Sequence, residues 1–540
     1  MNRTEPAGTP MGDRFHLYDT TLRDGAQREG IAYSVADKLA VARLLDELGV
    51  GFIEGGWPGA LPKDTEFFVR AAAGELSLRH AALVAFGSTR RAGVRAADDP
   101  QVRALVDSGA PVVTLVAKAD PRHIERALRV DTDEACAMVR DTVAHLVGLG
   151  RRVFVDAEHF FDGYAHDPET ALRVLRAAGE AGADVVVLCD TNGGQLPLGI
   201  AETVAEVGRR TGLRLGIHCQ DDTACAVANS VAAVQAGATH VQCTANGYGE
   251  RAGNADLFAV TGNLVAKLGM DVLPEGGAAE LTRVSHALAE LANIAPDTHQ
   301  AYVGSSAFAH KAGLHASAIK VDPLLYNHID PAVVGNDMRV LVTEMAGRAS
   351  LELKGAEIGL DLTDRPEALS SALKKVKALE SEGWSFEAAD ASLELLLRAE
   401  ADDAPPEPPF ALESYRVVLD HRRDGEVVSE ATVKVHVGGD RVIATAEGNG
   451  PVNALDAALR QALRRHLSWL DDVELADYKV RILAGNPGTD AVTRVLVGSS
   501  DGQREWTTVG VHANIVEASW LALCDALVYK AGVATADDGR

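Results

Sequence analysis

The residue pair of this 540-residue sequence best suited to metal chemistry is Asp24 with His218. Asp24 lies in DTTLRDGAQREG, after a short apolar run that begins at Phe15, and His218 belongs to the run RLGIHC. A carboxylate and an imidazole, completed by an amide or water, suit a catalytic divalent metal with open positions. Arg23 could stabilise an enolate or alkoxide formed beside such a metal. Each residue also has a non-catalytic interpretation. His218 could be a core histidine that is hydrogen-bonded to the backbone, and Arg23 could form a surface salt bridge.

Further polar side chains occur where other short β-like runs end. Gln27 follows Arg23 in the first turn, Glu158 ends the fifth run, and Thr191 follows the sixth. The others are Glu54, Asp190, Asn192, Gln220, Asn246, Glu250, Arg251 and Asn254. Each would be weak evidence alone, but polar groups at nearly every such end predict an active site. Glu250 and Arg251 have an equally good alternative interpretation, as an internal ion pair that orders their loop.

Eight β-like runs alternate with amphipathic helical stretches between residues 15 and 268. They begin at Phe15, Phe52, His80, Pro111, Arg152, Ala183, Arg214 and His240. Continuous Val, Ile, Leu and Ala are typical of strands buried on both faces of a parallel sheet. We therefore predict an α/β protein with a (β/α)8 TIM barrel over residues 15–280. An open doubly wound sheet is the alternative, but no G-x-G-x-x-G follows the first run.

The rest of the chain divides into three predicted segments. Residues 281–400 are predicted to form helical linker subdomains that complete the active site. Residues 401–410, ADDAPPEPPF, predict a stiff linker because they contain four prolines. In residues 411–540, three period-2 segments and a helix occur twice in the same order. Asn453, Asp456 and Ala457 match Asn514, Glu517 and Ala518 at one constant spacing. This predicts a duplicated βββα domain with a regulatory role.

Composition excludes several classes of function. Lys and Arg total 52 against 77 Asp and Glu, and the net charge of −25 argues against a nucleic-acid or anionic-membrane partner. No apolar run approaches the ~20 residues that a membrane span needs. Six scattered cysteines without a C-x-x-C pair predict reduced thiols in a cytoplasmic protein. Residues 1–14 are predicted to be a flexible tail.

Three motifs, DTTLRDG, GYGERAGNA and AFAHKAGLHASA, resemble those of the isopropylmalate/homocitrate/citramalate synthase family of metal-dependent acyltransferases. IEGGWPGALPKD and the helix ending in LDELG are most similar to its citramalate synthase branch. The resemblance extends over the barrel, the middle segment and the duplicated domain. It implies acetyl-CoA as co-substrate, a 2-oxo acid as substrate, and a transfer that converts the acyl group to alkyl.

The resemblance also implies a role for individual residues. The metal ligands would be Asp24, His218 and the residue at position 220; the catalytic residues Arg23, Glu250, His315 and Tyr326; the substrate-binding residues Gln27, Glu158, Thr191 and Asn254. His315, in AGLHASA, matches a histidine proposed to help enolise acetyl-CoA, and His310 is a second histidine of this motif.

One departure from the family pattern falls on the metal site. The family usually reads His-x-His-Asn-Asp where this chain has His218, Cys219, Gln220, Asp221 and Asp222. A glutamine oxygen binds hard cations such as Mg²⁺ or Mn²⁺ but is a poor donor for Zn²⁺. We expect an active Mg²⁺ or Mn²⁺ site that includes Gln220. Compensation by water or Asp221, weaker metal binding and lost activity are the alternatives.

The implied reaction is a Claisen-type condensation of acetyl-CoA with a 2-oxo acid, followed by thioester hydrolysis. With pyruvate the product would be citramalate, in the first step of a threonine-independent isoleucine pathway. The alternatives are an isopropylmalate or homocitrate synthase, a metal-dependent aldolase or lyase, and a catalytically inactive sensor.

The duplicated domain would bind isoleucine as an allosteric effector, or serve dimerisation alone. The resemblance implies a homodimer in which the segment carrying His315 reaches the barrel of the other copy.

Overall fold

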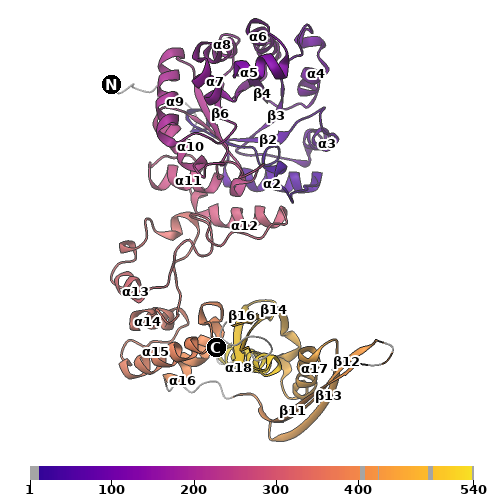
Figure 1. The fold of residues 1–540 in the computed structure, drawn as a ribbon, viewed down its shortest axis with the longest axis vertical. Coiled ribbons are helices and arrows are strands. Elements are labelled where there is room, and N and C mark those ends of the chain that lie inside the picture. Colours follow the sequence, from indigo (N-terminus) through magenta and orange to yellow (C-terminus); the bar gives the residue numbers. More distant parts are fainter. Residues whose placement is uncertain (1–10, 402–407, 422, 424, 484–490, 538–540) are drawn as a thin grey trace. The chain divides into compact units, whose positions relative to one another are not determined.

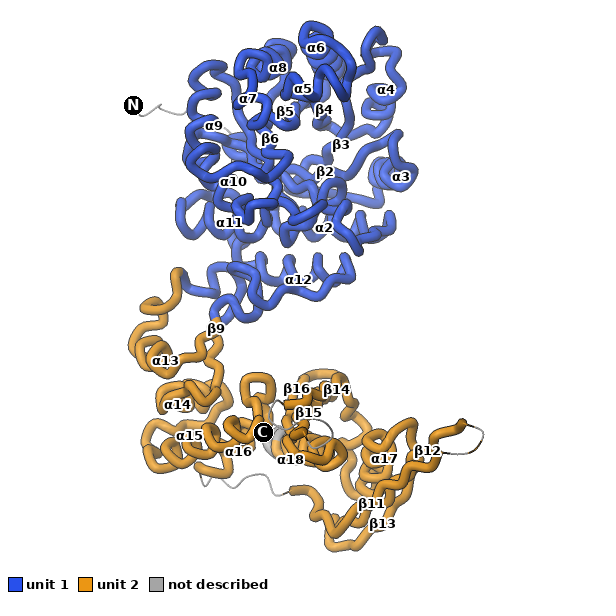
Figure 2. Tube along the Cα trace, viewed as in Figure 1, with its two compact units in different colours: residues 1–308, 329–337 blue, residues 309–328, 338–540 orange. Residues whose placement is uncertain are grey.

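The computed structural model describes residues 11–401, 408–421, 423, 425–483 and 491–537. The chain forms two compact units, which we describe separately (Figures 1 and 2). Residues 1–308 and 329–337 belong to the first unit, and residues 309–328 and 338–540 to the second. Residues 1–10 of the predicted tail and 402–407 of the predicted proline-rich linker lie outside the described residues.

The first unit contains a closed barrel of eight parallel strands. They are β1 (His16–Asp19), β2 (Phe52–Gly56), β3 (Ala82–Ser88), β4 (Val112–Lys118), β5 (Arg152–Glu158), β6 (Val185–Asp190), β7 (Leu215–Cys219) and β8 (His240–Cys243). Strand β1 pairs with β2 on one side and with β8 on the other, which closes the barrel. The predicted TIM barrel is therefore confirmed, and the open sheet is excluded.

Helices surround the barrel (Figure 1). They are α1 (Met11–Arg14), α2 (Val35–Leu48), α3 (Pro62–Arg70), α4 (Pro100–Asp107), α5 (Pro121–His123), α6 (Thr132–Gly148), α7 (Phe160–His166), α8 (Pro168–Glu180), α9 (Pro197–Thr211), α10 (Ala226–Gln235), α11 (Leu257–Ala266) and α12 (Leu281–Leu291). Their ends follow from local sequence. Ser34 accepts the amide of Asp37 at the start of α2, and Gly49, with φ of 95°, ends that helix.

Alternate residues of the barrel strands point into its interior. The hydroxyls of Tyr18 in β1 and Thr114 in β4 lie 2.8 Å apart, and Gln242 in β8 donates to Asp156 in β5 at 2.8 Å. Because these strands are not neighbours, both contacts cross the interior. Apolar side chains of the same set fill it, namely Phe52, Val84, Val112, Phe154, Val185 and Val187. A larger apolar cluster packs against the helices outside the strands.

The segment after α12 departs from the helix predicted for it. Residues 292–308 form turns, with Asn293 and Tyr302 at positive φ, because Pro296 and Gly304 interrupt a helical path. The second unit begins with β9 (Ala309–His310), which pairs in parallel with β10 (Arg339–Val340). The helices that follow are α13 (Gly313–Ile319), α14 (Arg348–Glu357), α15 (Pro366–Ser381) and α16 (Asp390–Glu400).

Two three-stranded antiparallel sheets, each followed by a helix, complete the second unit. The first comprises β11 (Ala411–His421), β12 (Val427–Val437), β13 (Asp440–Gly448) and α17 (Pro451–Leu463). The second comprises β14 (Glu474–Ile482), β15 (Thr493–Ser500), β16 (Glu505–His512) and α18 (Ile515–Asp537). The strand order repeats, so the predicted βββα duplication is confirmed.

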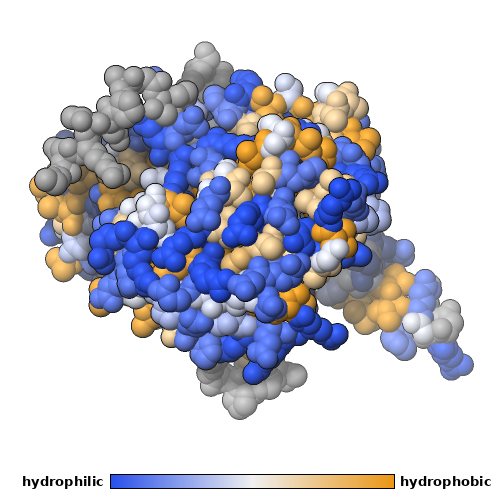
Figure 3. All heavy atoms as spheres, turned by 90° about the horizontal axis from the view of Figure 1, so that it is seen from above, coloured by the Kyte–Doolittle hydropathy of each residue, from blue (hydrophilic) through white to orange (hydrophobic). Residues whose placement is uncertain are grey.

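Hydrophilic residues cover most of the face shown in Figure 3, and hydrophobic residues are scattered among them. Within the described ranges, no helix is both long enough and apolar enough to cross a bilayer.

Candidate active site

Arg23 lies in the turn after β1, at the C-terminal end of the barrel, where two carboxylates hold its guanidinium. Nη1 donates to Oδ1 of Asp24 at 2.7 Å, and Nε donates to Oε1 of Glu54. The guanidinium carbon lies 4.0 Å from the centre of the Phe86 ring. Burial alone would lower the pKa of Arg23, but the charges of Glu54 and Asp24 outweigh burial and raise it. Arg23 is therefore a permanent cation of fixed orientation.

Glu54, in β2, is the buried anion that orients Arg23. Its side chain is 0% exposed. Oε1 accepts from the Thr20 hydroxyl at 3.1 Å as well as from Arg23, and Oε2 accepts from the Tyr18 hydroxyl. A buried carboxylate is stable only with a charge partner and hydrogen bonds. Glu54 therefore keeps the guanidinium of Arg23 at the C-terminal end of the barrel.

His218 lies on the inner side of β7, with Nε2 3.5 Å from Oδ2 of Asp24. Its Nδ1 is 2.9 Å from Oε1 of Gln242, and an amide oxygen can only accept, so Nδ1 carries the proton. The lone pair of Nε2 then faces Asp24. Burial lowers the pKa of His218, which favours the neutral ring that ligates metals. Burial would raise the pKa of Asp24, but Arg23 outweighs it and the pKa is lowered.

Two buried amide oxygens beside this pair, Oε1 of Gln220 and Oδ1 of Asn254, have no hydrogen-bond partner among the described residues. Gln220 and Asn254 are joined by a β-bridge, and Nε2 of Gln220 lies 3.0 Å from Oδ2 of Asp24 and 3.3 Å from Nε2 of His218. Buried polar atoms normally have partners. A carboxylate, an imidazole and amide oxygens suit a hard divalent cation, but here the amide nitrogen of Gln220 faces Asp24 and His218, so its oxygen would ligate such a cation only after the amide group turns over.

Metal-binding clusters made of three or more His, Cys, Asp or Glu do not occur in the part of the chain that the structure describes. A cation at Asp24 and His218 would therefore depend on the two amide oxygens. Gln220, which the sequence predicts to be a metal ligand, lies beside both residues, and its role as a ligand stays a prediction.

The loop after β8 requires glycine to bring Asn254 into place. Gly253 has φ of 100°, and a Cβ there would lie 2.1 Å from the carbonyl oxygen of Gly247. The amide nitrogen of Asn254 donates to the carbonyl of Tyr248 at 3.0 Å, which fixes the side chain.

The side chain of Arg251 links this loop to the segments that follow β6 and β7. Its Nε lies 2.7 Å from Oδ1 of Asp222, and Nη2 donates to the carbonyl of Thr191 at 2.9 Å. The alternative of an internal pair with Glu250 is therefore wrong. Arg251 has a left-handed backbone, with φ of 55°, a conformation that residues other than glycine seldom adopt. Glu250 is exposed, and its charge contributes, after the hydrogen bond and charge of Asp222, to raising the pKa of Arg251.

Glu158 and Thr191 lie at the ends of β5 and β6. Glu158 forms an ion pair with Lys118, the last residue of β4, and both side chains are 25% exposed. The Thr191 hydroxyl oxygen accepts the backbone amide of His159 at 2.8 Å. Its proton therefore remains available to a ligand.

Gln27 is exposed at the end of the short 3-10 turn Gly25–Gln27. A cavity of about 530 Å³ is lined by Gln27 and Arg23, and also by Lys63 and Trp57. A ligand that contacts Gln27 in this cavity would share a wall with Arg23.

His315 and Tyr326 belong to the second compact unit. Their rings stack with centroids 4.2 Å apart and an interplanar angle of 28°. The ring of His310 lies 6.2 Å from that of His315, and its Nε2 is 2.8 Å from Oδ1 of Asn327. Leu314, next to His315, is 75% exposed. The structure thus brings the two predicted residues together on an exposed part of this unit.

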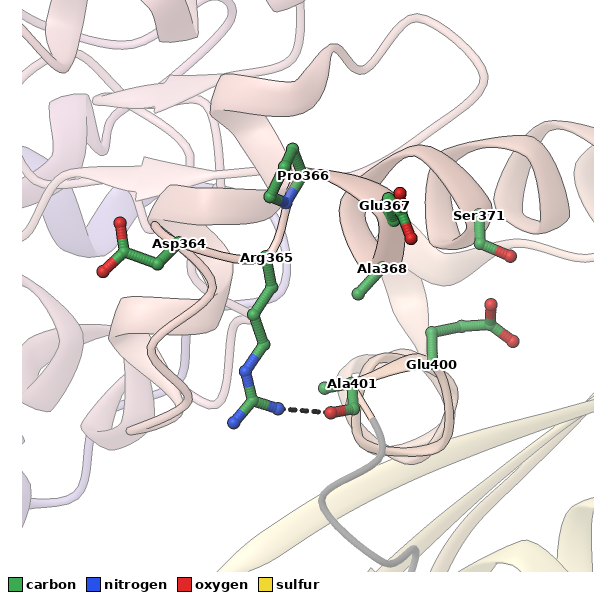
Figure 4. A pocket seen from close by; sticks show the side chains of 8 residues that line it. All are labelled: Asp364, Arg365, Pro366, Glu367, Ala368, Ser371, Glu400 and Ala401. Carbon is green, nitrogen blue, oxygen red and sulfur yellow. Dashed lines mark hydrogen bonds between the residues drawn. The ribbon is translucent and has the colours of Figure 1, made fainter.

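A cavity of about 700 Å³ at the start of α15 is lined by none of the predicted site residues (Figure 4). Asp364, Glu367 and Glu400 contribute carboxylates to its lining, and the guanidinium of Arg365 donates to the carbonyl of Ala401. Even with Glu400 paired to Lys375, acidic side chains outnumber the one guanidinium in this lining, which disfavours anionic substrates.

Gln242, Phe86 and Lys118 are site residues that sequence reasoning missed. Two of them could have been predicted from the alternation of side chains between the two faces of a strand. Gln242 is two residues after the buried His240, and Lys118 is four residues after Thr114, so each faces the barrel interior. No motif indicates that Phe86 lies beneath Arg23.

Three family models match the chain. The HMGL-like model matches residues 14–288, more than half of the chain. The model described as homocitrate synthase post-HMGL domain-like matches residues 302–383, and the LeuA allosteric (dimerisation) domain matches residues 387–531.

Similar proteins extend over nearly the whole chain. An (R)-citramalate synthase of Streptomyces coelicolor is 63% identical, covering 98% of this chain and 100% of that protein. An (R)-citramalate synthase of Aquifex aeolicus is 46% identical over 96% of this chain and 98% of its own. A 2-isopropylmalate synthase of Methanocaldococcus jannaschii is 28% identical over 95% and 94%. With its closed barrel and duplicated C-terminal domain, the chain belongs to the HMGL-like family and, within it, to the (R)-citramalate synthases.

Proposed function

We propose that the C-terminal end of the barrel condenses acetyl-CoA with pyruvate and that the thioester is then hydrolysed, giving citramalate and CoA. The chain is an enzyme of the citramalate synthase type, an acyltransferase. The observation that carries the proposed residue roles is the meeting of Asp24, His218 and Arg23 beside two partnerless amide oxygens.

Asp24, His218 and Gln220 would hold a divalent metal, with Asn254 as a further oxygen donor. Such a metal supplies Lewis-acid polarisation of the carbonyl of the 2-oxo acid. The neutral oxygens of Gln220 and Asn254 support Mg²⁺ or Mn²⁺ rather than Zn²⁺.

Arg23 would stabilise the negative charge that develops on the former ketone oxygen of pyruvate. Because Glu54 fixes its orientation, little reorganisation is needed when that charge appears. Thr191 would donate its free hydroxyl proton to the substrate, and Glu158 would line the same pocket. Gln27 would bind substrate from the adjacent cavity.

His315 would remove a methyl proton from acetyl-CoA, with Tyr326 stacked on the imidazole to orient it. We propose a homodimer in which this segment of one copy serves the barrel of the other. The match of residues 387–531 to a dimerisation domain supports the dimer. Glu250 remains a candidate for a second proton-transfer group because its exposed carboxylate is free to contact a ligand.

The duplicated domain is proposed to bind isoleucine as an inhibitor, supported by its match to the LeuA allosteric domain. Isoleucine should inhibit the full-length enzyme, whereas equal inhibition by unrelated amino acids would contradict a specific site. We also propose a cytoplasmic location, because all six cysteines are free thiols.

Release of free CoA from acetyl-CoA tests the reaction. Pyruvate with Mg²⁺ or Mn²⁺ should give the fastest release, with citramalate as product. Preference for 2-oxoisovalerate or 2-oxoglutarate would instead indicate an isopropylmalate or homocitrate synthase. Cleavage of citramalyl thioesters without condensation would indicate a lyase, and inertness with all substrates and metals a sensor. The identity of 63% to a citramalate synthase, against 33% and 28% to two 2-isopropylmalate synthases, supports pyruvate.

A further inference from the structure

Lys118 is an inward-facing cation that the proposed mechanism does not use. It is the last residue of β4, four residues after Thr114. The Thr114 hydroxyl meets that of Tyr18 across the barrel interior. Because side chains alternate along a strand, Lys118 points to the same side as Thr114, at the C-terminal mouth.

The side chain of Glu158 also points into the barrel mouth. It follows Asp156 by two residues, and Asp156 binds Gln242 across the interior. Lys118 and Glu158 are direct partners in the parallel register of β4 and β5, and their side chains form an ion pair.

Stability alone is a poor explanation for this pair. Each side chain is 25% exposed, and ion pairs accessible to water contribute little to folding. A long lysine held in the mouth also loses side-chain entropy. The same exposure means, however, that a ligand in the mouth can approach both charges.

The charge balance of the mouth suggests what the lysine does. Arg23 is shared by two carboxylates, those of Asp24 and Glu54. Glu158 has Lys118 as its cation. Without Lys118 the third carboxylate would stand unpaired beside the pocket proposed for an anionic 2-oxo acid, and like charges repel at this range.

We propose that Lys118 sets the affinity of the pocket for the 2-oxo acid, because it neutralises Glu158 so that the pocket accepts the carboxylate of the substrate. This inference rests on the proposed function. It predicts that Lys118 governs affinity for the 2-oxo acid far more than the rate of the chemical step.

The test uses the full-length, metal-loaded enzyme. Lys118→Met should raise KM for pyruvate about tenfold or more with a much smaller change in kcat. Lys118→Arg keeps the charge and should stay near the wild-type KM. Arg122→Met, which removes a nearby exposed cation bound to Asp120, is the matched control and should leave KM unchanged. Thermal unfolding of each variant checks that the fold is intact.

Direct binding of pyruvate without acetyl-CoA, followed by calorimetry, separates charge from chemistry. Lys118→Met should weaken binding, and adding Glu158→Gln to it should recover much of the loss, because the unpaired charge is then gone. A purely structural role would not give this recovery.

The inference is overturned if wild type releases CoA with pyruvate while Lys118→Met keeps the wild-type affinity. It is equally overturned if Lys118→Arg is as impaired as Lys118→Met, or if Glu158→Gln brings no recovery. Failure of the wild type itself to release CoA with pyruvate would instead refute the proposed function on which the inference rests.

Discussion

The imidazole of His218 donates its Nδ1 proton to the side-chain oxygen of Gln242, 2.9 Å away. Gln242 is itself held by Asp156, to which its amide nitrogen donates at 2.8 Å. This arrangement turns the unprotonated Nε2 of His218 toward Asp24. A glutamine from the next strand thus determines which nitrogen of the histidine can act as a ligand.

Gln242→Leu should weaken metal binding. Leucine cannot accept the Nδ1 proton, so the imidazole loses its fixed tautomer and orientation, and affinity should fall about 10- to 100-fold. Titration calorimetry with Mn²⁺ measures the change. Thr114→Val removes a different interior hydrogen bond and should leave affinity near wild type. An equal loss in both variants would show a general effect on the barrel.

Gln220→His should shift the metal preference toward Zn²⁺. A second imidazole replaces a neutral oxygen donor, and nitrogen ligands favour zinc, so the ratio of Zn²⁺ to Mn²⁺ affinity should rise about tenfold or more. Competition titrations of the two metals measure this ratio. An unchanged ratio would place residue 220 outside the metal shell.

Arg23→Met should lower kcat about 10²- to 10³-fold, because the developing oxyanion loses its cation. It should also lower the free energy of unfolding by about 3–5 kcal/mol, because Glu54 is left buried without its charge partner. Steady-state kinetics and urea unfolding measure the two effects. Arg28→Met, in the same turn, is the control and should change neither strongly. Near-normal turnover of Arg23→Met would refute its proposed role.

His315→Ala should reduce turnover by orders of magnitude while metal binding at the barrel stays intact. The imidazole is the proposed base for acetyl-CoA, and none of the proposed metal ligands lies in its segment. CoA release and Mn²⁺ titration on the same sample separate the two properties. Normal turnover would exclude His315 as the base.

Acid should destabilise the protein through His16 and His240, whose Nδ1 atoms lie 3.2 Å apart. Burial lowers the pKa of His16 to about 3, and that of His240 well below its usual value. Below pH ~6.5 the unfolded chain binds protons that the folded chain does not, so stability falls as pH drops from about 6.5 toward 3.

Urea midpoints measured between pH 7 and 5 test this dependence. His16→Gln removes one of the two groups and should flatten the loss of stability on the acid side. Identical slopes for wild type and variant would contradict a contribution from His16.

The barrel could be predicted from sequence because its strands are continuous apolar runs. Such runs are typical of strands that are buried on both faces of a parallel sheet. The closeness of Asp24 and His218 followed from barrel closure. The partner of Arg251 did not, because a left-handed backbone at that residue decides where its side chain points.

Gln242 escaped prediction for a different reason. A polar residue within a strand carries no motif, and its role depends on which side chain faces it across the interior. The turns at residues 292–308 likewise depend on packing and on residues at positive φ. Amino-acid composition, which favoured helices in this segment, does not indicate either of them.

The strand order has a consequence for how the enzyme is made. Arg23 and Asp24 directly follow the first strand and Glu54 lies in the second, whereas His218 and Gln242 lie in the last two. These two parts of the site come together when the barrel closes by pairing of β1 with β8. On a nascent chain Glu54 can already pair with Arg23, whereas Asp24 lacks its later partners His218 and Gln220 until the last strands have emerged from the ribosome. Completion of the catalytic centre and closure of the barrel are one late event of synthesis.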